Sequence, residues 1–208
     1  SLFLEPKIKN LLPNPLQLKD MDKGVDRVFQ CIKKEETIGI FGDYDVDGAS
    51  STAILNRYFN SIKQKVHTYI PDRHKEGYGP SIEGFKKLSE KKVKIIFTVD
   101  CGTLSFEPIN FAQKSKIDVI ILDHHQSDLK LPKAHAIINP NRFDDKSGLN
   151  YLCAAGVCFV FLVGLNKKLR ENNWFNENNI NQPNILNLLD LVSLGTVCDV
   201  VPLVGLNR

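Results

Sequence analysis

Short apolar runs alternate with longer amphipathic stretches from residue 37 to about residue 139. The run at 37–41 is rich in isoleucine, and the stretch at 48–62 that follows it has the apolar spacing of a helix. The same alternation predicts strands at 66–71, 93–99, 117–122 and 135–139, and helices at 80–92 and 105–115. Strands that are nearly continuously apolar and separated by helices are typical of a parallel sheet covered on both faces. The pattern therefore predicts an α/β fold with a mostly parallel sheet of about five strands.

The pattern changes after Pro140. Two longer helices are predicted at 152–170 and 184–195, and the asparagine-rich stretch between them has the turn and cap chemistry of a surface connection. The longest apolar run, 151–165, contains glycines and is shorter than the roughly 20 residues of a membrane-spanning helix, so it predicts a buried helix. We expect a helical C-terminal part after the sheet.

Composition narrows the class of protein only slightly. The 208 residues are 42% hydrophobic, which is enough for one ordinary domain or two small ones. The five cysteines are scattered and never spaced as C-x-x-C, which argues against a disulfide framework and a zinc site and favours a reducing cytoplasm. The N-terminus lacks the pattern of a secretory signal, and no membrane partner is expected. A net charge of +3 is too small to indicate nucleic acid by itself.

Aspartates follow three of the predicted strands. They are Asp43, Asp45 and Asp47 after the first strand, Asp100 after the third and Asp123 after the fourth. Because the carboxyl ends of parallel strands meet at one edge of a sheet, ligands bind there, near a switch in strand order. Asp199, after the last predicted helix, is a further candidate for the same edge. Each aspartate alone is explained as a helix N-cap or a turn residue, and only their coincidence favours a binding site.

Four or more carboxylates at one edge need cations between them. Two carboxylates about 4 Å apart repel by roughly 4 kcal/mol at an effective dielectric constant of 20. Carboxylate oxygens supplemented by imidazole suit Mn²⁺ or Mg²⁺, and His124 and His125 supply the imidazoles. With so many ligands we predict two ions, the arrangement that serves phosphoryl transfer. We expect the adjacent histidines to point in different directions, one toward metal and the other toward substrate.

Four motifs follow one another along the chain. They are DYDVDG at 43–48, VDCG at 99–102, DHH at 123–125 and GTVCDVVPL at 195–203. In this order they closely resemble the DHH phosphoesterase superfamily, and YIPDRHKEGYG, INPNR and VVPLVGLNR are similar to its single-strand-specific exonuclease branch. The resemblance covers nearly all of the chain. It implies a Mn²⁺- or Mg²⁺-dependent exonuclease that degrades single-stranded DNA from the 5′ end to mononucleotides in DNA repair and recombination.

The resemblance also implies metal ligands. Asp45 and Asp47 would each hold one ion, and Asp100 would bridge both. His124 and Asp199 would complete the shell of the second ion. These five residues, together with His125, would carry the catalysis.

Three further positions have implied roles or depart from the superfamily pattern. Asp43 would be an added metal-binding carboxylate, and Asp123 would orient the histidine pair, as outer carboxylates usually do. His125 would contact the scissile phosphate. Many members of the superfamily carry a histidine four residues before the aspartate that matches Asp45, but this chain has Phe41 there. Asp43 is the expected substitute ligand.

The loop at 72–79 is a candidate for DNA contact. Its cations suit a phosphate backbone and its tyrosine suits base stacking, although a charged, glycine-containing loop is also an ordinary surface connection. The predicted nucleic-acid contacts are Arg73, His74, Lys75, Tyr78, Arg142 and Arg208.

The expected division of the chain is an N-terminal extension at 1–36, with a helix that packs on the domain, and a DHH catalytic domain at 37–208. Exonucleases of this branch carry a second lobe that is absent here, so we expect a fragment. Its exonuclease activity should be weak, because affinity for DNA grows with the number of phosphates neutralised. Single-strand-binding protein and a helicase are further candidate partners.

Two other interpretations stay open. Within the superfamily, the chain could belong to a phosphodiesterase for short oligonucleotides or cyclic dinucleotides, or to a pyrophosphatase. In a different class, it could be a catalytically silent scaffold. A scaffold should have lost metal ligands. This chain keeps five of them: Asp45, Asp47, Asp100, His124 and Asp199.

Overall fold

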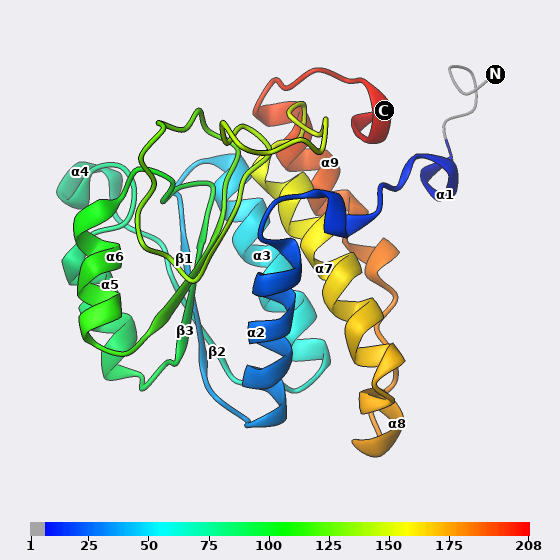
Figure 1. Cartoon of the computed structure of the whole chain (residues 1–208), viewed down its shortest axis with the longest axis horizontal. Coiled ribbons are helices and arrows are strands. Elements are labelled where there is room, and N and C mark those ends of the chain that lie inside the picture. Colours follow the sequence, from blue (N-terminus) through cyan, green and yellow to red (C-terminus); the bar gives the residue numbers. More distant parts are fainter. Residues whose placement is uncertain (1–6) are drawn as a thin grey trace.

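The structure, a computed structural model, describes residues 7–208 and contains a five-stranded sheet with helices on both faces (Figure 1). All neighbouring strands pair in parallel, in the order β2-β1-β3-β4-β5. The strands are β1 (Ile38–Gly42), β2 (Val66–Tyr69), β3 (Ile95–Val99), β4 (Asp118–Leu122) and β5 (Ala136–Ile138). The predicted fold class is confirmed.

The helices form two layers around the sheet (Figure 1). One layer consists of α2 (Met21–Lys33), α3 (Val46–Ser61) and α7 (Ala154–Glu171), and the other of α5 (Ile82–Glu90) and α6 (Phe106–Lys114). Helix α9 (Leu189–Cys198) packs against α3 and α7. The short elements are α1 (Ile8–Leu11), α4 (Arg73–Glu76), α8 (Trp174–Glu177) and the 3₁₀ helices η1 (Pro15–Gln17), η2 (Ile185–Leu188) and η3 (Gly205–Asn207).

Each layer of helices covers its own hydrophobic core. Phe97 on β3 belongs to the larger core, where its ring lies 5.7 Å from that of Phe59 on α3 and 5.4 Å from that of Phe161 on α7. Phe41 on β1 points the other way, into the smaller core, and packs against Phe85. Because β1 and β3 are buried along their whole length, their side chains are apolar on both faces, with Thr98 as the exception. This explains the nearly continuous apolar runs in the sequence.

The predicted elements agree with the structure to within a few residues. The helix predicted at 152–170 is α7, and the one predicted at 184–195 is a 3₁₀ turn followed by α9, which ends at Cys198. In the N-terminal part, α2 packs on α7 and β5, while residues 1–6 of the predicted extension lie outside the described residues. Between residues 7 and 208 no helix is both long and apolar enough to cross a membrane.

The strand order places a topological switch point between β1 and β3. From β1 the chain moves outward to β2 and then returns to β3 on the opposite side of β1. At such a point the connections leave the carboxyl ends of neighbouring strands in opposite directions, which opens a crevice. The aspartates that follow β1 and β3 lie at this crevice.

Candidate metal centre

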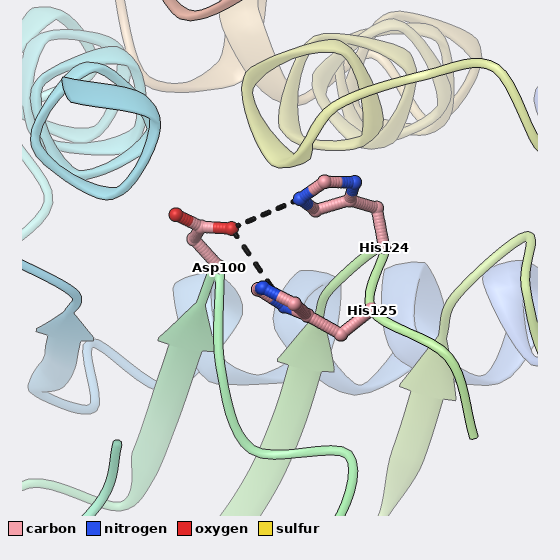
Figure 2. A group of neighbouring side chains, drawn as sticks. All are labelled: Asp100, His124 and His125. Carbon is pink, nitrogen blue, oxygen red and sulfur yellow. Dashed lines mark ion pairs between the residues drawn. The ribbon is translucent and has the colours of Figure 1, made fainter. Parts of the chain in front are cut away.

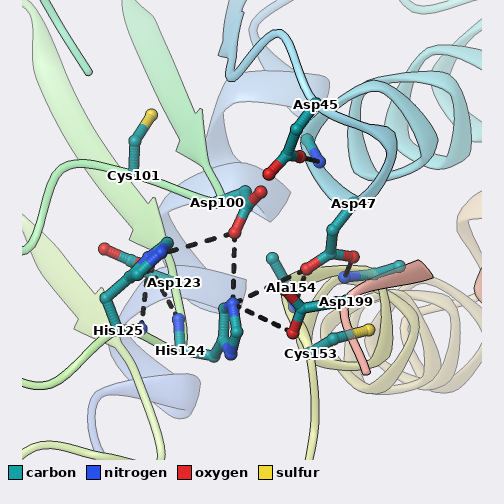
Figure 3. Close-up of polar contacts among 12 residues, drawn as sticks. Asp45, Asp47, Asp100, Cys101, Asp123, His124, His125, Cys153, Ala154 and Asp199 are labelled. Carbon is teal, nitrogen blue, oxygen red and sulfur yellow. Dashed lines mark hydrogen bonds and ion pairs between the residues drawn. The ribbon is translucent and has the colours of Figure 1, made fainter. Parts of the chain in front are cut away.

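All six predicted metal ligands, together with His125, come together at the carboxyl edge of the sheet, and Figure 3 labels each of them except Asp43. They form three overlapping groups, and within each group the ligand atoms lie within 4.8 Å of one another. The groups are Asp43, Asp45 and Asp100; Asp47, His124 and Asp199; and Asp100, His124 and His125. Because Asp100 and His124 each belong to two groups, the three form one continuous cluster.

The imidazole of His124 is surrounded by carboxylates. Its Nε2 lies 3.3 Å from Asp100 Oδ1, 3.5 Å from Asp199 Oδ2 and 3.7 Å from Asp47 Oδ2. These three carboxylates come from the end of β3, the end of α9 and the start of α3. Segments that are distant along the chain thus meet at one nitrogen atom, within the reach of a single cation.

Several buried polar atoms of the cluster have no hydrogen-bond partner among the described residues. They are both carboxylate oxygens of Asp100, Oδ1 of Asp43 and Nε2 of His124. A buried polar group without a partner is costly, and native structures seldom leave one unsatisfied. The donor set therefore fits divalent cations.

The pKa values of the aspartates also indicate that the cluster fits divalent cations. Burial, together with repulsion from Asp47 and Asp45, raises the pKa of Asp100 to about 10. Burial also raises the pKa of Asp43 and of Asp47. So many carboxylates cannot all be ionised here without added positive charge, and oxygen ligands with one or two imidazoles suit Mn²⁺ or Mg²⁺.

Asp47 is anchored by the N-terminus of α7, a contact that sequence reasoning missed. Its Oδ2 accepts a hydrogen bond of 2.6 Å from the amide of Ala154, and its Oδ1 one of 2.9 Å from the amide of Ala155. The first amides of a helix lack partners within the helix and favour a negative charge. Gly195 of α9 lies so close that a Cβ atom there would be 2.6 Å from Asp47 Oδ1. No short-range signal in the sequence indicates these contacts.

Asp45 has a structural role as well as a place in the cluster. It is the N-cap of α3, where its Oδ1 accepts a hydrogen bond of 2.9 Å from the amide of Gly48. The structural explanation of this aspartate is therefore correct, and the same side chain lies in the cluster with Asp43 and Asp100.

Asp123 contacts both histidines and accepts hydrogen bonds at both of its carboxylate oxygens. Its Oδ2 accepts from the amide and the hydroxyl of Thr103, and its Oδ1 from the amides of His124 and His125 and from Nδ1 of His125 at 2.7 Å. Burial alone would raise the pKa of Asp123, but the hydrogen bonds from His125 and Thr103 hold it at about 2. Asp123 is ionised and supports the histidines, while Thr103 is a supporting residue that the motifs did not indicate.

The expectation that the two histidines point in different directions is wrong. Figure 2 shows both rings turned toward Asp100, whose Oδ1 lies 3.3 Å from His124 Nε2 and 3.9 Å from His125 Nδ1. The ring centroids are 4.7 Å apart. The strand ends at Leu122, so the alternation of side chains along a strand no longer applies, and the bonds to Asp123 turn His125 back toward the cluster.

Phe41 does not line the cluster. Its side chain is fully buried in the smaller core, with its ring 5.5 Å from that of Tyr69 and 5.8 Å from that of Phe85. This position therefore serves packing, and Asp43, two residues later, brings a carboxylate to the group of Asp45 and Asp100.

The loop predicted to contact DNA reaches the rim of the cluster through Tyr78. The hydroxyl of Tyr78 donates a hydrogen bond of 3.2 Å to the main-chain carbonyl of Asp100, and its ring meets that of His125 edge-on at 5.9 Å. Arg73 lies over the ring of Tyr44, and Lys75 pairs loosely with Asp72. The side chains of Arg73, His74, Lys75 and Tyr78 are exposed, and their contact with DNA stays a prediction.

The two other predicted contacts lie elsewhere. Arg208 is exposed and lines an apolar groove of about 700 Å³ that Leu152 and Val197 also line, and its contact with DNA stays a prediction. Arg142 is only 9% exposed, which disfavours the predicted contact with DNA, and that contact stays a prediction. Its guanidinium binds Asp20 at 2.6 Å, Asp144 at 2.9 Å and the carbonyl of Ile137, so most of its N–H groups have partners inside the protein.

Replacing Arg142 by alanine should therefore act on stability. We expect the free energy of unfolding to fall by about 1–3 kcal/mol, because charge-assisted hydrogen bonds are lost and Asp20 keeps only part of its solvation. Affinity for single-stranded DNA, measured by fluorescence anisotropy, should not change. Arg57→Ala, which removes an exposed arginine paired with Asp190 at 3.7 Å, is the control and should leave the unfolding curve in place. A loss of DNA affinity at unchanged stability would support the predicted contact with DNA.

The DHH family, N-terminal domain, matches residues 37–196. The chain belongs to the DHH family. The resemblance inferred from the four motifs is confirmed, and the structure adds Asp199, which lies just beyond the matched range, to the cluster of this DHH domain.

The chain is similar to curated exonucleases named RecJ. It is 39% identical to the single-stranded-DNA-specific exonuclease RecJ of Escherichia coli (strain K12) over 206 residues, which are 99% of this chain and 36% of that protein. It is 35% identical to RecJ of Bacillus subtilis (strain 168) over 207 residues, which are 100% of this chain and 24% of that protein. The chain thus spans about a quarter to a third of the length of these relatives.

Solved structures show the same fold. A crystal structure of exonuclease RecJ bound to manganese matches with a TM-score of 0.78 and 30% identity, over 92% of this chain and 46% of that one. RecJ in complex with Mn²⁺ from Thermus thermophilus matches with a TM-score of 0.73 and 29% identity, over 95% of this chain and 26% of that one.

Proposed function

We propose that this DHH domain is the catalytic part of a two-metal phosphodiesterase that degrades single-stranded DNA from the 5′ end to mononucleotides. The observation that carries the proposal is the continuous cluster in which three ligand groups share Asp100 and His124. Relatives that are named single-stranded-DNA-specific exonucleases, and RecJ structures that are named as bound to Mn²⁺, support both the substrate and the cofactor. Mn²⁺ or Mg²⁺ would be the resident ion.

The predicted ligands would be distributed between two ions. Asp45 and Asp47 would each contact one ion, Asp100 would bridge them, and His124 with Asp199 would complete the ligand shell of the second ion. The sharing of Asp100 between two groups and the contacts of His124 support this division. When bound, a pair of such ions supplies a water molecule of lowered pKa and stabilises charge on the attacking and leaving oxygens.

The chain's own groups would orient the phosphate. Asp43, beside Asp45 and Asp100, would add negative charge to hold the first ion. His125 is about half exposed, and its hydrogen bond to Asp123 raises its pKa above the ordinary value. With both ring nitrogens protonated, the imidazole would donate a hydrogen bond to a non-bridging oxygen of the scissile phosphate.

The two histidines give a test of these roles. His125→Gln should leave Mn²⁺ binding nearly unchanged and lower kcat by about 10²- to 10³-fold, the usual cost of one hydrogen-bond donor to the transition state. His124→Gln should weaken Mn²⁺ binding itself, because Nε2 of His124 lies among three carboxylates. Calorimetric titration with Mn²⁺ and steady-state kinetics separate the two effects. Equal loss of Mn²⁺ affinity in both variants would contradict the assignment of His125.

Substrate class decides between the proposed function and its alternatives. The intact protein with Mn²⁺ should release labelled mononucleotides from the 5′ end of a long single strand and leave a blunt duplex and a 5′-blocked strand uncut. Faster hydrolysis of a dinucleotide, a cyclic dinucleotide or pyrophosphate would favour the other phosphoesterase activities. No hydrolysis of any substrate, with Mn²⁺ bound, would favour a scaffold.

Several broader expectations belong to the same proposal. Residues 1–36 would be an extension and residues 37–208 the catalytic domain. The 208 residues alone would degrade DNA weakly, because DNA affinity grows with the number of phosphates neutralised and their net charge is only +3. The enzyme would act in the cytoplasm on strands supplied by a helicase or coated by single-strand-binding protein.

A further inference from the structure

Both main-chain carbonyls of the histidine pair are bound by asparagine side chains. Nδ2 of Asn141 donates to the carbonyl of His124, and Nδ2 of Asn139 donates to the carbonyl of His125 at 2.9 Å. The two asparagines lie directly after β5, in the INPNR segment. Arg142, the arginine of that segment, binds Asp20 and Asp144. The two asparagines are the residues of the segment that contact the histidine pair.

Asn139 is fully buried, and its amide has only one satisfactory orientation. Its Nδ2 also donates to Oγ1 of Thr103 at 2.9 Å, and its Oδ1 accepts from the amide of Asn141 at 2.8 Å. Because Thr103 Oγ1 already donates to Asp123, it can only accept from Asn139. If the side-chain amide of Asn139 were flipped, its Oδ1 would face two acceptors, Thr103 Oγ1 and the carbonyl of His125. Its Nδ2 would then face the main-chain N–H of Asn141, which would lose its acceptor. The orientation of the Asn139 side chain is therefore over-determined. Asn139 and Asn141 together are called the asparagine clamp.

The amide side of the histidine pair is held in the same way. The amides of His124 and His125 both donate to Oδ1 of Asp123. All four main-chain polar groups of the pair are thus bound by side chains, two by Asp123 and one each by Asn139 and Asn141. Beyond the end of β4, side chains take over the role that a strand ladder plays within a sheet.

We propose that Asn139 and Asn141 are positioning residues, which fix the main chain of His124 and His125 so that both imidazoles converge on Asp100. Neither asparagine belongs to the groups that could hold a cation. They act through the histidines, and the catalytic consequence rests on the proposed function. Partners that orient metal-binding side chains typically contribute 10- to 100-fold to affinity or activity.

The test compares Asn139→Ala and Asn141→Ala with Asn166→Ala in the intact protein. Asn166 is a matched control, since it is 4% exposed and accepts a hydrogen bond from Tyr58 at 3.1 Å, but lies in the larger core on α7. Each substitution removes an amide side chain that accepts or donates a hydrogen bond. The measurements are the thermal transition, kcat and KM on a 5′-labelled single strand, and the downfield proton signal of Nδ1–H of His125 in the metal-free protein. The absence of that signal in His125→Gln assigns it.

We expect kcat to fall about 10- to 100-fold in both clamp variants, with KM changed less than about threefold. The signal of His125 should shift or broaden in these variants and remain in place in Asn166→Ala. Kinetics and a signal that match the control, at equal loss of thermal stability, would overturn the proposal. If the wild-type protein hydrolyses no DNA, the proposed function fails, and the proton signal alone decides whether the clamp positions the histidines.

Discussion

Replacing Asp100 by asparagine should abolish binding of both ions and with it nearly all turnover. Asp100 belongs to two of the three ligand groups, and both of its carboxylate oxygens are buried without a hydrogen-bond partner among the described residues. An asparagine keeps the size of the side chain but loses the charge and one of the two oxygens. The loss of activity should exceed the roughly 10- to 100-fold cost of removing a group that only supports a metal ligand.

The same substitution should stabilise the metal-free protein. In the folded state the pKa of Asp100 is raised to about 10, far above its ordinary value of 3.8. A carboxyl group whose folded pKa is raised costs stability at every pH above its unfolded pKa, because ionisation favours the unfolded chain. At neutral pH, Asp100→Asn removes this cost, so the thermal transition without metal should move upward. The stabilisation that Mn²⁺ gives to the wild-type protein should disappear.

In Asp100→Asn, the thermal transition should move upward without metal, and the stabilisation by Mn²⁺ should be lost. Thermal denaturation with and without Mn²⁺ gives both shifts, and a titration with Mn²⁺ counts the bound ions. Asp190→Asn is the control, because this aspartate lies on α9, is mostly exposed and pairs only loosely with Arg57. An Asp100→Asn protein that still binds two ions would show that Asp100 does not bridge them.

The fold could be predicted from the sequence because burial and pattern agree in each strand. β1 and β3 are buried on both faces, so their runs are apolar apart from the buried Thr98, and α5, which leads into β3, carries one apolar stripe. Parallel strands then bring their carboxyl ends to one edge, which assembles Asp45, Asp100 and His124 from topology alone. The gathering of the ligands was predictable for this reason.

Contacts between distant segments were not predictable. The amides of Ala154 and Ala155 anchor Asp47 across more than 100 residues, and Asp20 reaches Arg142 across 122 residues. Nothing local in the sequence distinguishes Arg142 from an arginine that meets a phosphate, because its partners are set by the tertiary fold. The predicted direction of the histidine pair failed for the same reason, since it depends on Asp123 and on the loop after β5 rather than on strand alternation.

Replacing Asp123 by asparagine should cause a larger loss of stability than replacing any residue of the cluster that it supports. Its carboxylate accepts five hydrogen bonds from Thr103, His124 and His125 and is 1% exposed. In an asparagine, an NH₂ group replaces one of the two carboxylate oxygens. This donor would face the N–H and O–H donors that now bind Asp123. Breaking a buried charged network of this kind costs about 3–5 kcal/mol, because the remaining groups lose their partner and are not rehydrated.

The loss should depend on pH with a defined sign. In the folded state the pKa of Asp123 is held at about 2, against an ordinary value of 3.8, which corresponds to about 2 kcal/mol. A group whose folded pKa is depressed contributes stability above its unfolded pKa and loses it as the pH falls through the folded pKa. The gap between wild type and Asp123→Asn should widen as the pH falls from about 7 to about 6, because Asp123 raises the pKa of His125 in the folded wild type. It should then shrink by about 1 kcal/mol at about pH 3, as Asp123 loses its own contribution.

Urea unfolding at a series of pH values measures this gap. Asp128→Asn, in the exposed part of the loop that follows the histidines, is the control and should give the wild-type curve at every pH. A gap that does not shrink as the pH falls to about 3 would mean that Asp123 is not held ionised by its five donors. In that case the carboxylate would not be the fixed point that turns His125 toward Asp100, and the convergence of the two rings would need another cause.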